Sequence, residues 1–174
     1  MPIYALGDLT PDIAPDAFVH PDAVIIGSVT IGSESSIWPG AVLRGDRGRI
    51  RVGRRTSIQD GSVVHCTSTL DTTIGDECTI GHLVHLEACT IADGALIGSG
   101  STVLPGATVG PGAIVAAQAL VPPGLHIPAR ALARGVPARI IDHGADPDIN
   151  RHAVEIYIDN ARWYGQSLRR ISET

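Results

Sequence analysis

A branched aliphatic residue recurs at every sixth position along much of this chain. The first run is Ile13, Val19, Ile25, Ile31, Ile37 and Leu43, and later runs extend the ladder to Ile127. A helix repeats near 3.6 residues and a half-buried strand near 2, so neither template explains a period of six. Short strands with one inward residue, joined by tight corners, do explain it. Such hexapeptides are typical of a parallel β-helix.

The residue four places after most of these anchors is small, for example Ala23, Ala41, Thr56 and Ser62. Each hexapeptide then forms one wall of a prism, and three walls form one coil. Nineteen anchors predict about six coils, stacked about 4.8 Å apart like neighbouring strands. Because each buried anchor contributes roughly 1.5–3 kcal/mol, the ladder can supply the core. The predicted fold class is all-β.

The composition agrees with a narrow prism and restricts the partners. Aromatic residues make up 3% of the chain, and the net charge is −5 without a basic run. This charge argues against nucleic acid as a partner. No signal peptide or apolar stretch of membrane length is present in the sequence, so we expect no membrane association. The three cysteines lack CxxC spacing, which predicts reduced packing residues in a cytoplasmic protein.

The ladder ends at Ile127, and residues 128–150 are expected to form an irregular strap. From about 152 to 172 the apolar residues follow helical spacing; they are Val154, Tyr157, Ile158, Ala161, Tyr164, Leu168 and Ile171. We therefore expect residues 1–141 to form the β-helix with its end strap. Residues 142–174 are expected to form a linker and a C-terminal α-helix that packs on the prism.

The ladder is interrupted on consecutive coils, and rigid scaffolds often carry their sites at such loops. The irregular steps are nine residues from Leu43 to Val52, ten from Val64 to Ile74, and five from Leu86 to Ile91. Counting walls places Arg44, His65 and Glu87 in one outward column. His65 and Glu87 then lie on adjacent coils, about 4.8 Å apart at the backbone. His82 lies at a corner one wall earlier, where a neighbouring prism can receive it.

Several motifs in order resemble the γ-class carbonic anhydrase family of the hexapeptide-repeat superfamily. The matching stretches are residues 42–46, 57–61 leading to His65, 80–82 leading to Leu86 and Cys89, and 124–138. The resemblance covers nearly the whole chain. It implies a left-handed β-helix, a homotrimer, and zinc (or iron or cobalt) at the subunit interfaces. It also implies a lyase that hydrates carbon dioxide reversibly to bicarbonate by means of a metal-bound hydroxide.

The resemblance implies that His65 is one metal ligand and that His82 is donated by the neighbouring subunit. At the third ligand position this chain has Glu87 where the family has histidine. Two imidazoles and one carboxylate form an accepted zinc ligand set. His85 also flanks an inward residue and points outward, so it is the alternative ligand. In that case Glu87 would orient a ligand or act as a general base.

Other matched positions complete the candidate site. Arg44, Asp46 and Asp60 are expected to form an ion-pair network between subunits, as the resemblance also implies. Gln59 is a candidate to orient the metal-bound hydroxide, and a solvated amide is the alternative. Tyr164 matches a family tyrosine near the site, although its position on the helix also suits packing.

Two departures from the family indicate weak carbon dioxide hydration or another small substrate. Glu87 would reduce the positive charge of the metal, and the insertion after His65 contains one acid, Asp71, in place of an acidic proton-shuttle loop. Two other classes stay open. One is a hexapeptide acyltransferase that uses coenzyme A, and the other is a non-catalytic trimeric scaffold or binding protein.

Overall fold

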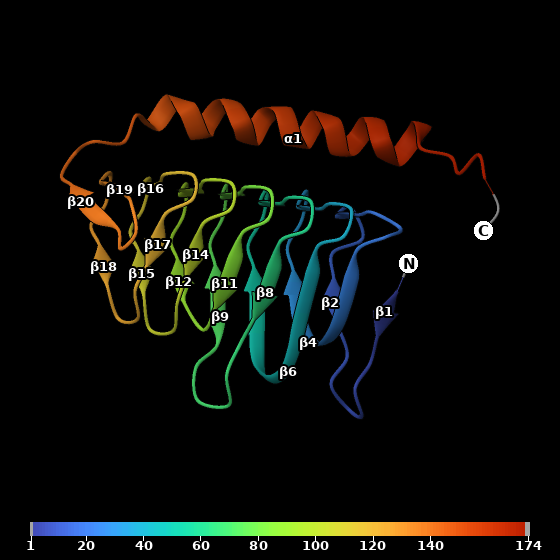
Figure 1. Ribbon diagram of the computed structural model, residues 1–174. Coiled ribbons are helices and arrows are strands. Elements are labelled where there is room, and N and C mark those ends of the chain that lie inside the picture. Colours follow the sequence, from blue (N-terminus) through green and yellow to red (C-terminus); the bar gives the residue numbers. More distant parts are fainter. Residues whose placement is uncertain (1, 173–174) are drawn as a thin grey trace.

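The computed structural model describes residues 2–172 and has the predicted left-handed parallel β-helix, followed by one helix (Figure 1). The prism has about seven turns, one more than the sequence analysis predicts. The additional turn begins with β1 (Ile3–Tyr4), whose residues pair with Ile25 and Ile26 on the next coil. Ile3 and Ile13 are ten positions apart. The intervening loop therefore hides this turn from a search for a period of six.

The strands form three walls, which we name A, B and C. Wall A contains β1, the first half of β4 (Val24–Ile31), the first half of β6 (Val42–Val52), β8 (Val63–His65), β11 (His85–Glu87), β14 (Thr102–Val103) and β17 (Leu120–Val121). Wall B contains β2 (Asp12–Ile13), the second halves of β4 and β6, β9 (Thr72–Ile74), β12 (Thr90–Ile91), β15 (Thr108–Val109) and β18 (His126–Ile127). Wall C contains β3 (Phe18–Val19), β5 (Ser36–Ile37), β7 (Ser57–Ile58), β10 (Thr79–Ile80), β13 (Leu96–Ile97), β16 (Ile114–Val115) and β19 (Leu132–Arg134).

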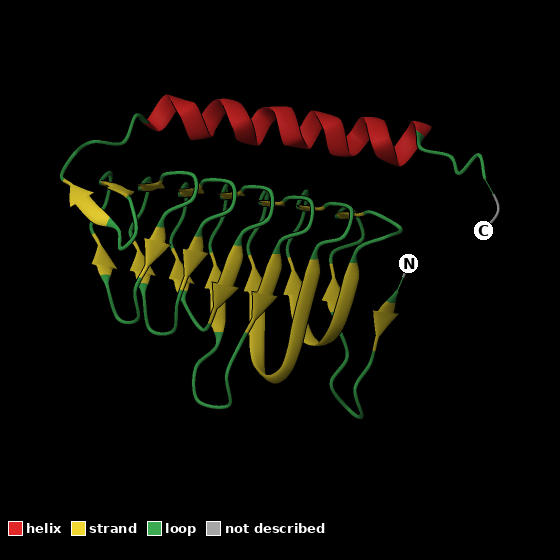
Figure 2. Cartoon of the chain, in the orientation of Figure 1, coloured by secondary structure: helices red, strands yellow, loops and turns green. Residues whose placement is uncertain are grey.

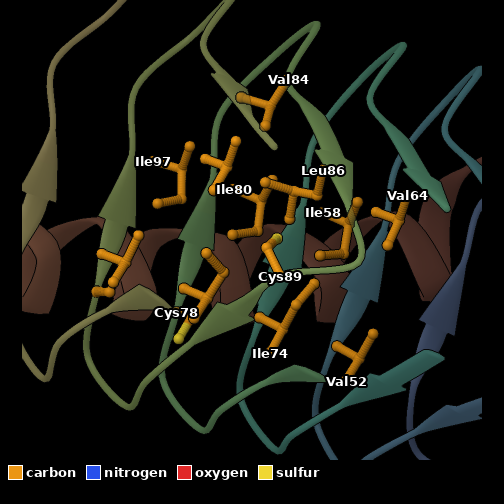
Figure 3. Close-up of a cluster of buried hydrophobic side chains, with 14 of the residues drawn as sticks. Val52, Ile58, Val64, Ile74, Cys78, Ile80, Val84, Leu86, Cys89 and Ile97 are labelled. Atoms are coloured by element: carbon orange, nitrogen blue, oxygen red, sulfur yellow. The ribbon is translucent and has the colours of Figure 1, made fainter. Parts of the chain in front are cut away.

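The hydrophobic core fills the interior of the prism. Figure 3 shows side chains from all three walls meeting there, such as Val64 from wall A, Ile74 from wall B and Ile80 from wall C. These three residues are at most 1% exposed. Ile13, at the end of the prism, is only partly buried, because strands in the first coil have a neighbour on one side only.

The end of the prism differs from the predicted irregular strap. β19 continues wall C, where Ala133 pairs with Val115, and β20 (Arg139–Ile141) pairs with β19 in antiparallel fashion. Ala133 is six residues after Ile127 and is fully buried. A small residue thus occupies an anchor position, which is why the ladder ends too early in the sequence. The prediction of an irregular segment was wrong for these two strands.

The helix α1 (Pro147–Ser167) runs along the whole prism and covers wall C (Figure 2). It begins and ends about five residues earlier than predicted. Asp146 is the N-cap, and its side chain accepts a hydrogen bond from the amide of Asp148. Aspartate at the N-cap followed by proline at the first helical position is a strong start signal. This Asp-Pro pair falls within residues 128–150, so the prediction of an irregular strap was wrong for the first turn of α1.

Aromatic packing and ion pairs hold α1 on wall C. The ring of Trp38 lies 5.5 Å from Tyr157 and 5.1 Å from Tyr164, both edge to face. Such pairs contribute about 0.5–1.5 kcal/mol beyond their buried area. Arg55 pairs with Glu155 at 2.6 Å. The helix is thereby fixed to the wall next to the candidate site.

Within residues 2–172 no helix combines the length and the apolar character that a bilayer span requires.

Candidate functional site

The candidate site lies on wall A, where the ladder is interrupted. In the parallel register, Arg44 on β6 pairs with His65 on β8, and His65 pairs with Glu87 on β11. All three side chains point outward, because each follows a buried anchor of its strand. The structure thus forms the column that wall counting predicts.

The imidazole of His65 lies between two carboxylates. Its Nδ1 is 3.2 Å from Oε1 of Glu87, and its Nε2 is 3.0 Å from Oδ1 of Asp46. A neutral imidazole has one N–H, so only the doubly protonated ring donates to both carboxylates at once. The side chain of His65 is 18% exposed. This ring is therefore held on both sides in a partly buried position.

Asp46 is bound from its other side by Arg44. The guanidinium of Arg44 donates to Oδ2 of Asp46 within the same chain. Desolvation alone would raise the pKa of Asp46, but hydrogen bonds from His65 and Arg44 and the charge of Arg44 outweigh it and lower the pKa. Asp46 is therefore a stable anion beside the imidazole. The network that Arg44 and Asp46 are predicted to make between subunits stays a prediction.

Gly45, which lies between Arg44 and Asp46, allows β4 and β6 to approach each other. A Cβ atom on Gly45 would lie 2.4 Å from the carbonyl oxygen of Ser28, which is far inside a van der Waals contact. Gly45 is therefore required where β6 turns from wall A toward wall B. This close approach places Asp46 next to His65.

His82 lies at the corner between walls C and A. Its Nδ1 is 2.9 Å from Oδ2 of Asp60, and both side chains are about half exposed. Among the described residues, Nε2 of His82 has no hydrogen-bond or ion-pair partner. Within the chain Asp60 orients His82, and its predicted place in a network between subunits stays a prediction.

His85 lies on wall A in the outward column next to that of His65. It pairs in register with Val63 and Thr102, and its Nε2 is 3.8 Å from Oε2 of Glu87. Glu87 therefore lies between two imidazoles of its own chain. This geometry keeps both Glu87 and His85 as candidates for a third ligand.

The donors in one chain do not form a complete metal site. Among residues 2–172, no group of three or more His, Cys, Asp and Glu side chains is placed to hold a metal ion. The donor chemistry nevertheless suits zinc, since imidazole and carboxylate are both zinc ligands. A metal at His65 and Glu87 would need a further donor from a second copy, and the exposed His82 has a ring nitrogen without a partner.

The remaining two predicted site residues are less directly connected. Gln59 is buried at the end of β7, next to Asp60. Tyr164 packs on Trp38 and lies 6.2 Å from the ring of Phe18. These ring contacts give Tyr164 the packing role that the sequence analysis named as its alternative, and its catalytic role stays a prediction.

The pKa of another tyrosine of α1, Tyr157, is affected by the charge of Asp60, the partner of His82. Burial, and then the negative charge of Asp60, raise the pKa of Tyr157. Tyr157 precedes Tyr164 by seven residues, or two helical turns, so both lie on the same face of α1. That spacing is visible in the sequence, where by itself it predicts only packing.

The inserted loop after His65 is bound to β6. Asp71 accepts a hydrogen bond from the amide of Arg49 at 2.8 Å and lies 3.6 Å from the guanidinium of Arg51. The amide of Gly48 contacts Sγ of Cys66 at 3.2 Å. The one acid of this loop therefore holds the loop in place.

A groove of about 460 Å³ lies elsewhere, between α1 and a corner of the prism. Its lining includes Glu77, Arg130 and Asn150 but none of the predicted site residues. The candidate site is therefore a partly exposed patch of wall A and its corner, outside this groove.

Comparison with known proteins supplies relatives for this arrangement. The family model of bacterial transferase hexapeptide (six repeats) matches residues 10–45, 71–104 and 88–123. The carnitine operon protein CaiE of Escherichia coli O157:H7 is 41% identical over 150 residues, which cover 86% of this chain and 76% of that protein. The mitochondrial gamma carbonic anhydrase 2 of Arabidopsis thaliana is 43% identical over 148 residues, covering 82% of this chain and 53% of that protein. The chain thus spans about half the length of the plant relative.

Among solved structures, a Bacillus cereus protein described provisionally as an acetyltransferase has a TM-score of 0.91. It is 36% identical, and the match covers 93% of this chain and 95% of that one. The Bacillus cereus structure shares the architecture of this chain, while the names of the relatives point to different activities.

Proposed function

The chain belongs to the bacterial transferase hexapeptide family and is related to CaiE and the gamma carbonic anhydrases, and from this premise we propose that it hydrates carbon dioxide reversibly. In this proposal the site is shared between copies of a homotrimer and holds zinc, with iron or cobalt as alternatives. The observation that carries it is the pairing of His65 with Glu87, whose side chains approach to 3.2 Å, together with an exposed His82 at the corner whose Nε2 has no partner among the described residues.

The residues that would hold the metal are His65 and Glu87 of one subunit and His82 of its neighbour. When bound, such a metal acts as a Lewis acid and lowers the pKa of water toward about 7. Carboxylates that bind the outer nitrogen of a ligating histidine fix its tautomer and its orientation. Asp60 does this for His82 by accepting from Nδ1 at 2.9 Å. The exposed Nε2 is then the nitrogen presented to a neighbouring subunit.

Asp46 performs the corresponding task for His65, because it contacts Nε2 of the ring and is held from its far side by Arg44. Nδ1, which faces Glu87, is then the nitrogen of His65 that would bind the metal together with Glu87. Glu87 also adds a negative charge where an imidazole would add none. Because this charge weakens the activation of water, we expect carbon dioxide hydration near neutral pH to be slow.

Gln59 and Tyr164 keep secondary places in the proposal. Gln59 precedes Asp60 and is buried, and its proposed role is to donate a hydrogen bond to a substrate oxygen at this corner. Tyr164 supports the site through its packing on Trp38.

The test is metal analysis of protein purified without chelators and supplied in turn with zinc, iron or cobalt. We expect close to one metal per subunit, a trimer in solution, and measurable hydration of carbon dioxide in stopped-flow assays. His65→Ala and His82→Ala should each lose the metal and the activity while the trimer persists. Unchanged occupancy in either variant would contradict the proposed ligand set.

A second function, acyl transfer from coenzyme A, is favoured by one comparison. The Bacillus cereus structure is described provisionally as an acetyltransferase, and His65 beside two carboxylates is also a reasonable general base. Consumption of acetyl-coenzyme A by metal-free protein with a small amine or alcohol acceptor would support this function. A metal-free trimer without either activity would instead favour the scaffold.

A further inference from the structure

The side chain of Thr72 connects the two coils that carry His65 and Glu87. Thr72 is the first residue of β9, and it is fully buried. Its hydroxyl donates to the carbonyl oxygen of His65 and accepts from the amide of Ala88 at 2.8 Å. One buried hydroxyl thus contacts the backbone of His65 and the residue immediately after Glu87.

This connection lies at two of the breaks in the ladder. Thr72 is where the loop inserted after His65 returns to the prism, and Ala88 is where the shortened corner after Glu87 begins. Ala88 has a φ of 49°, in the left-handed region that residues other than glycine rarely adopt. Both breaks lack the regular hexapeptide geometry, so their register needs a contact of its own.

The direct backbone hydrogen bond between these coils is longer than the bonds made by the hydroxyl of Thr72. The amide of Ala88 is 3.2 Å from the carbonyl oxygen of His65 and is shared with the hydroxyl of Thr72. Without that hydroxyl, the carbonyl and the amide would keep only this longer contact. The backbone at Ala88 would then be free to relax from its unfavourable φ.

We propose that Thr72 is a positioning residue that sets the separation of His65 and Glu87. By fixing the peptide groups next to both residues, it fixes the directions in which their side chains leave the backbone. Its consequence for metal binding rests on the proposed function, but its effect on the His65–Glu87 pair does not.

Thr56 provides a matched control in the same chain. Its buried hydroxyl also joins two coils, since it donates to the carbonyl oxygen of Gly75 at 2.8 Å and accepts from the amide of Cys78 at 3.0 Å. None of these three residues belongs to the candidate site. Removal of either hydroxyl therefore costs similar hydrogen bonds, but only Thr72 is next to the His65 column.

The experiment compares Thr72→Val, Thr72→Ala, Thr72→Ser and Thr56→Val with the unmodified protein, all metal-free at first. Two readouts do not depend on metal: the ring ¹⁵N chemical shifts of His65 and the hydrogen exchange of the Ala88 amide. We expect Thr72→Val and Thr72→Ala to shift the His65 signals and to accelerate exchange at Ala88 about tenfold. Thr72→Ser should restore both, and Thr56→Val should leave both unchanged despite a similar loss of thermal stability.

Zinc affinity, measured by competition with a chromophoric chelator, is the third readout. We expect Thr72→Val to weaken it roughly 10-fold or more, as for other supports of metal ligands, while Thr56→Val stays within about twofold. If the unmodified protein binds no zinc, the proposed function fails, and the first two readouts still decide the role of Thr72.

Three results would overturn the role of Thr72. The first is that Thr72→Val and Thr72→Ala keep the His65 chemical shifts and the Ala88 exchange rate of the unmodified protein. The second is an equal change of both in Thr56→Val. The third is failure of Thr72→Val and Thr72→Ala to fold, which would assign the hydroxyl to stability alone.

Discussion

Glu87 lies one coil away from His65, and its Oε1 is 3.2 Å from Nδ1 of the imidazole. Asp46 contacts the other ring nitrogen at 3.0 Å. The ring of His65 is therefore enclosed by two carboxylates of its own chain, one of them at the position where the family has histidine. In the proposed function, this pair would decide how strongly the site binds a metal and how acidic water at that metal becomes.

Glu87→His should strengthen metal binding and carbon dioxide hydration. The substitution removes one negative charge and supplies the third imidazole, so a bound metal would activate water more strongly. We expect roughly tenfold higher zinc affinity and a comparable rise in kcat/KM at pH 7. Chelator competition and stopped-flow assays check this, and a variant that binds less zinc than the unmodified protein would contradict it.

Glu87→Gln and His85→Ala distinguish the two candidates for the third ligand. The amide of glutamine keeps the shape of the carboxylate but is a poor zinc ligand. If Glu87 is the ligand, Glu87→Gln should lower zinc affinity at least about tenfold, whereas His85→Ala should stay within about twofold. The reverse order of these affinities would assign the metal to His85.

Ala88→Gly should stabilise the protein. Ala88 has a φ of 49°, and the left-handed conformation costs residues other than glycine roughly 1–2 kcal/mol. Glycine adds entropy to the unfolded chain, so the net gain in the free energy of unfolding is expected to be about 0.5–1 kcal/mol. Denaturant unfolding measures this gain.

Ala92→Gly is the control for that substitution. The backbone of Ala92 is not among those with positive φ, so its replacement by glycine should lower the free energy of unfolding by about 0.5–1 kcal/mol. Equal effects of the two glycine substitutions would show that strain at Ala88 is not relieved.

The thiols of Cys78 and Cys89 should be inert in the folded protein. Burial raises the pKa of each to about 12, and the thiolate is the reactive form. At pH 8 we expect them to react with a disulfide reagent only as fast as the protein unfolds. Peptide mapping after timed labelling identifies the modified residues, and rapid labelling of either thiol in folded protein would contradict the prediction.

The same pKa shift predicts the dependence of stability on alkaline pH. Because the folded pKa lies above the ordinary value of 9.0, the unfolded chain releases these protons first. The resulting stabilisation is complete below about pH 9 and is lost as the pH rises from 9 toward 12. A Cys78→Ala/Cys89→Ala variant should show a smaller decline in the free energy of unfolding over this range.

The sequence contains most of the fold, because the interior of a narrow prism accepts few side chains. Every sixth residue must be aliphatic, so a ladder such as Ile25, Ile31 and Ile37 predicts the coils directly. The ladder does not predict the coils where an inward position lacks a branched aliphatic residue or where the spacing is not six. Ala133 at the far end keeps the spacing of six but is small, and Ile3 at the near end lies ten residues before the first anchor, Ile13; both belong to the prism.

Of the candidate site, the sequence predicts only the outward column of Arg44, His65 and Glu87. Wall counting places His65 and Glu87 on adjacent coils, since register follows from the number of residues per coil. The partners of their side chains depend on rotamers and on neighbouring loops, so the contact of Asp46 with His65 did not follow from the sequence. Thr72 occupies the place of the small inward residue two positions before an anchor, but it was missed because the ten-residue step from Val64 to Ile74 puts it eight residues, instead of four, after the preceding anchor.

The inward and the outward side chains of this prism have separate roles. An outward residue such as Glu87 contacts others on its wall and the adjacent coils, while the buried Leu86 beside it carries the stability of its coil. Outward residues can therefore be substituted one coil at a time without disturbing the architecture. Proteins that share this fold can consequently differ in chemistry through their outward residues alone.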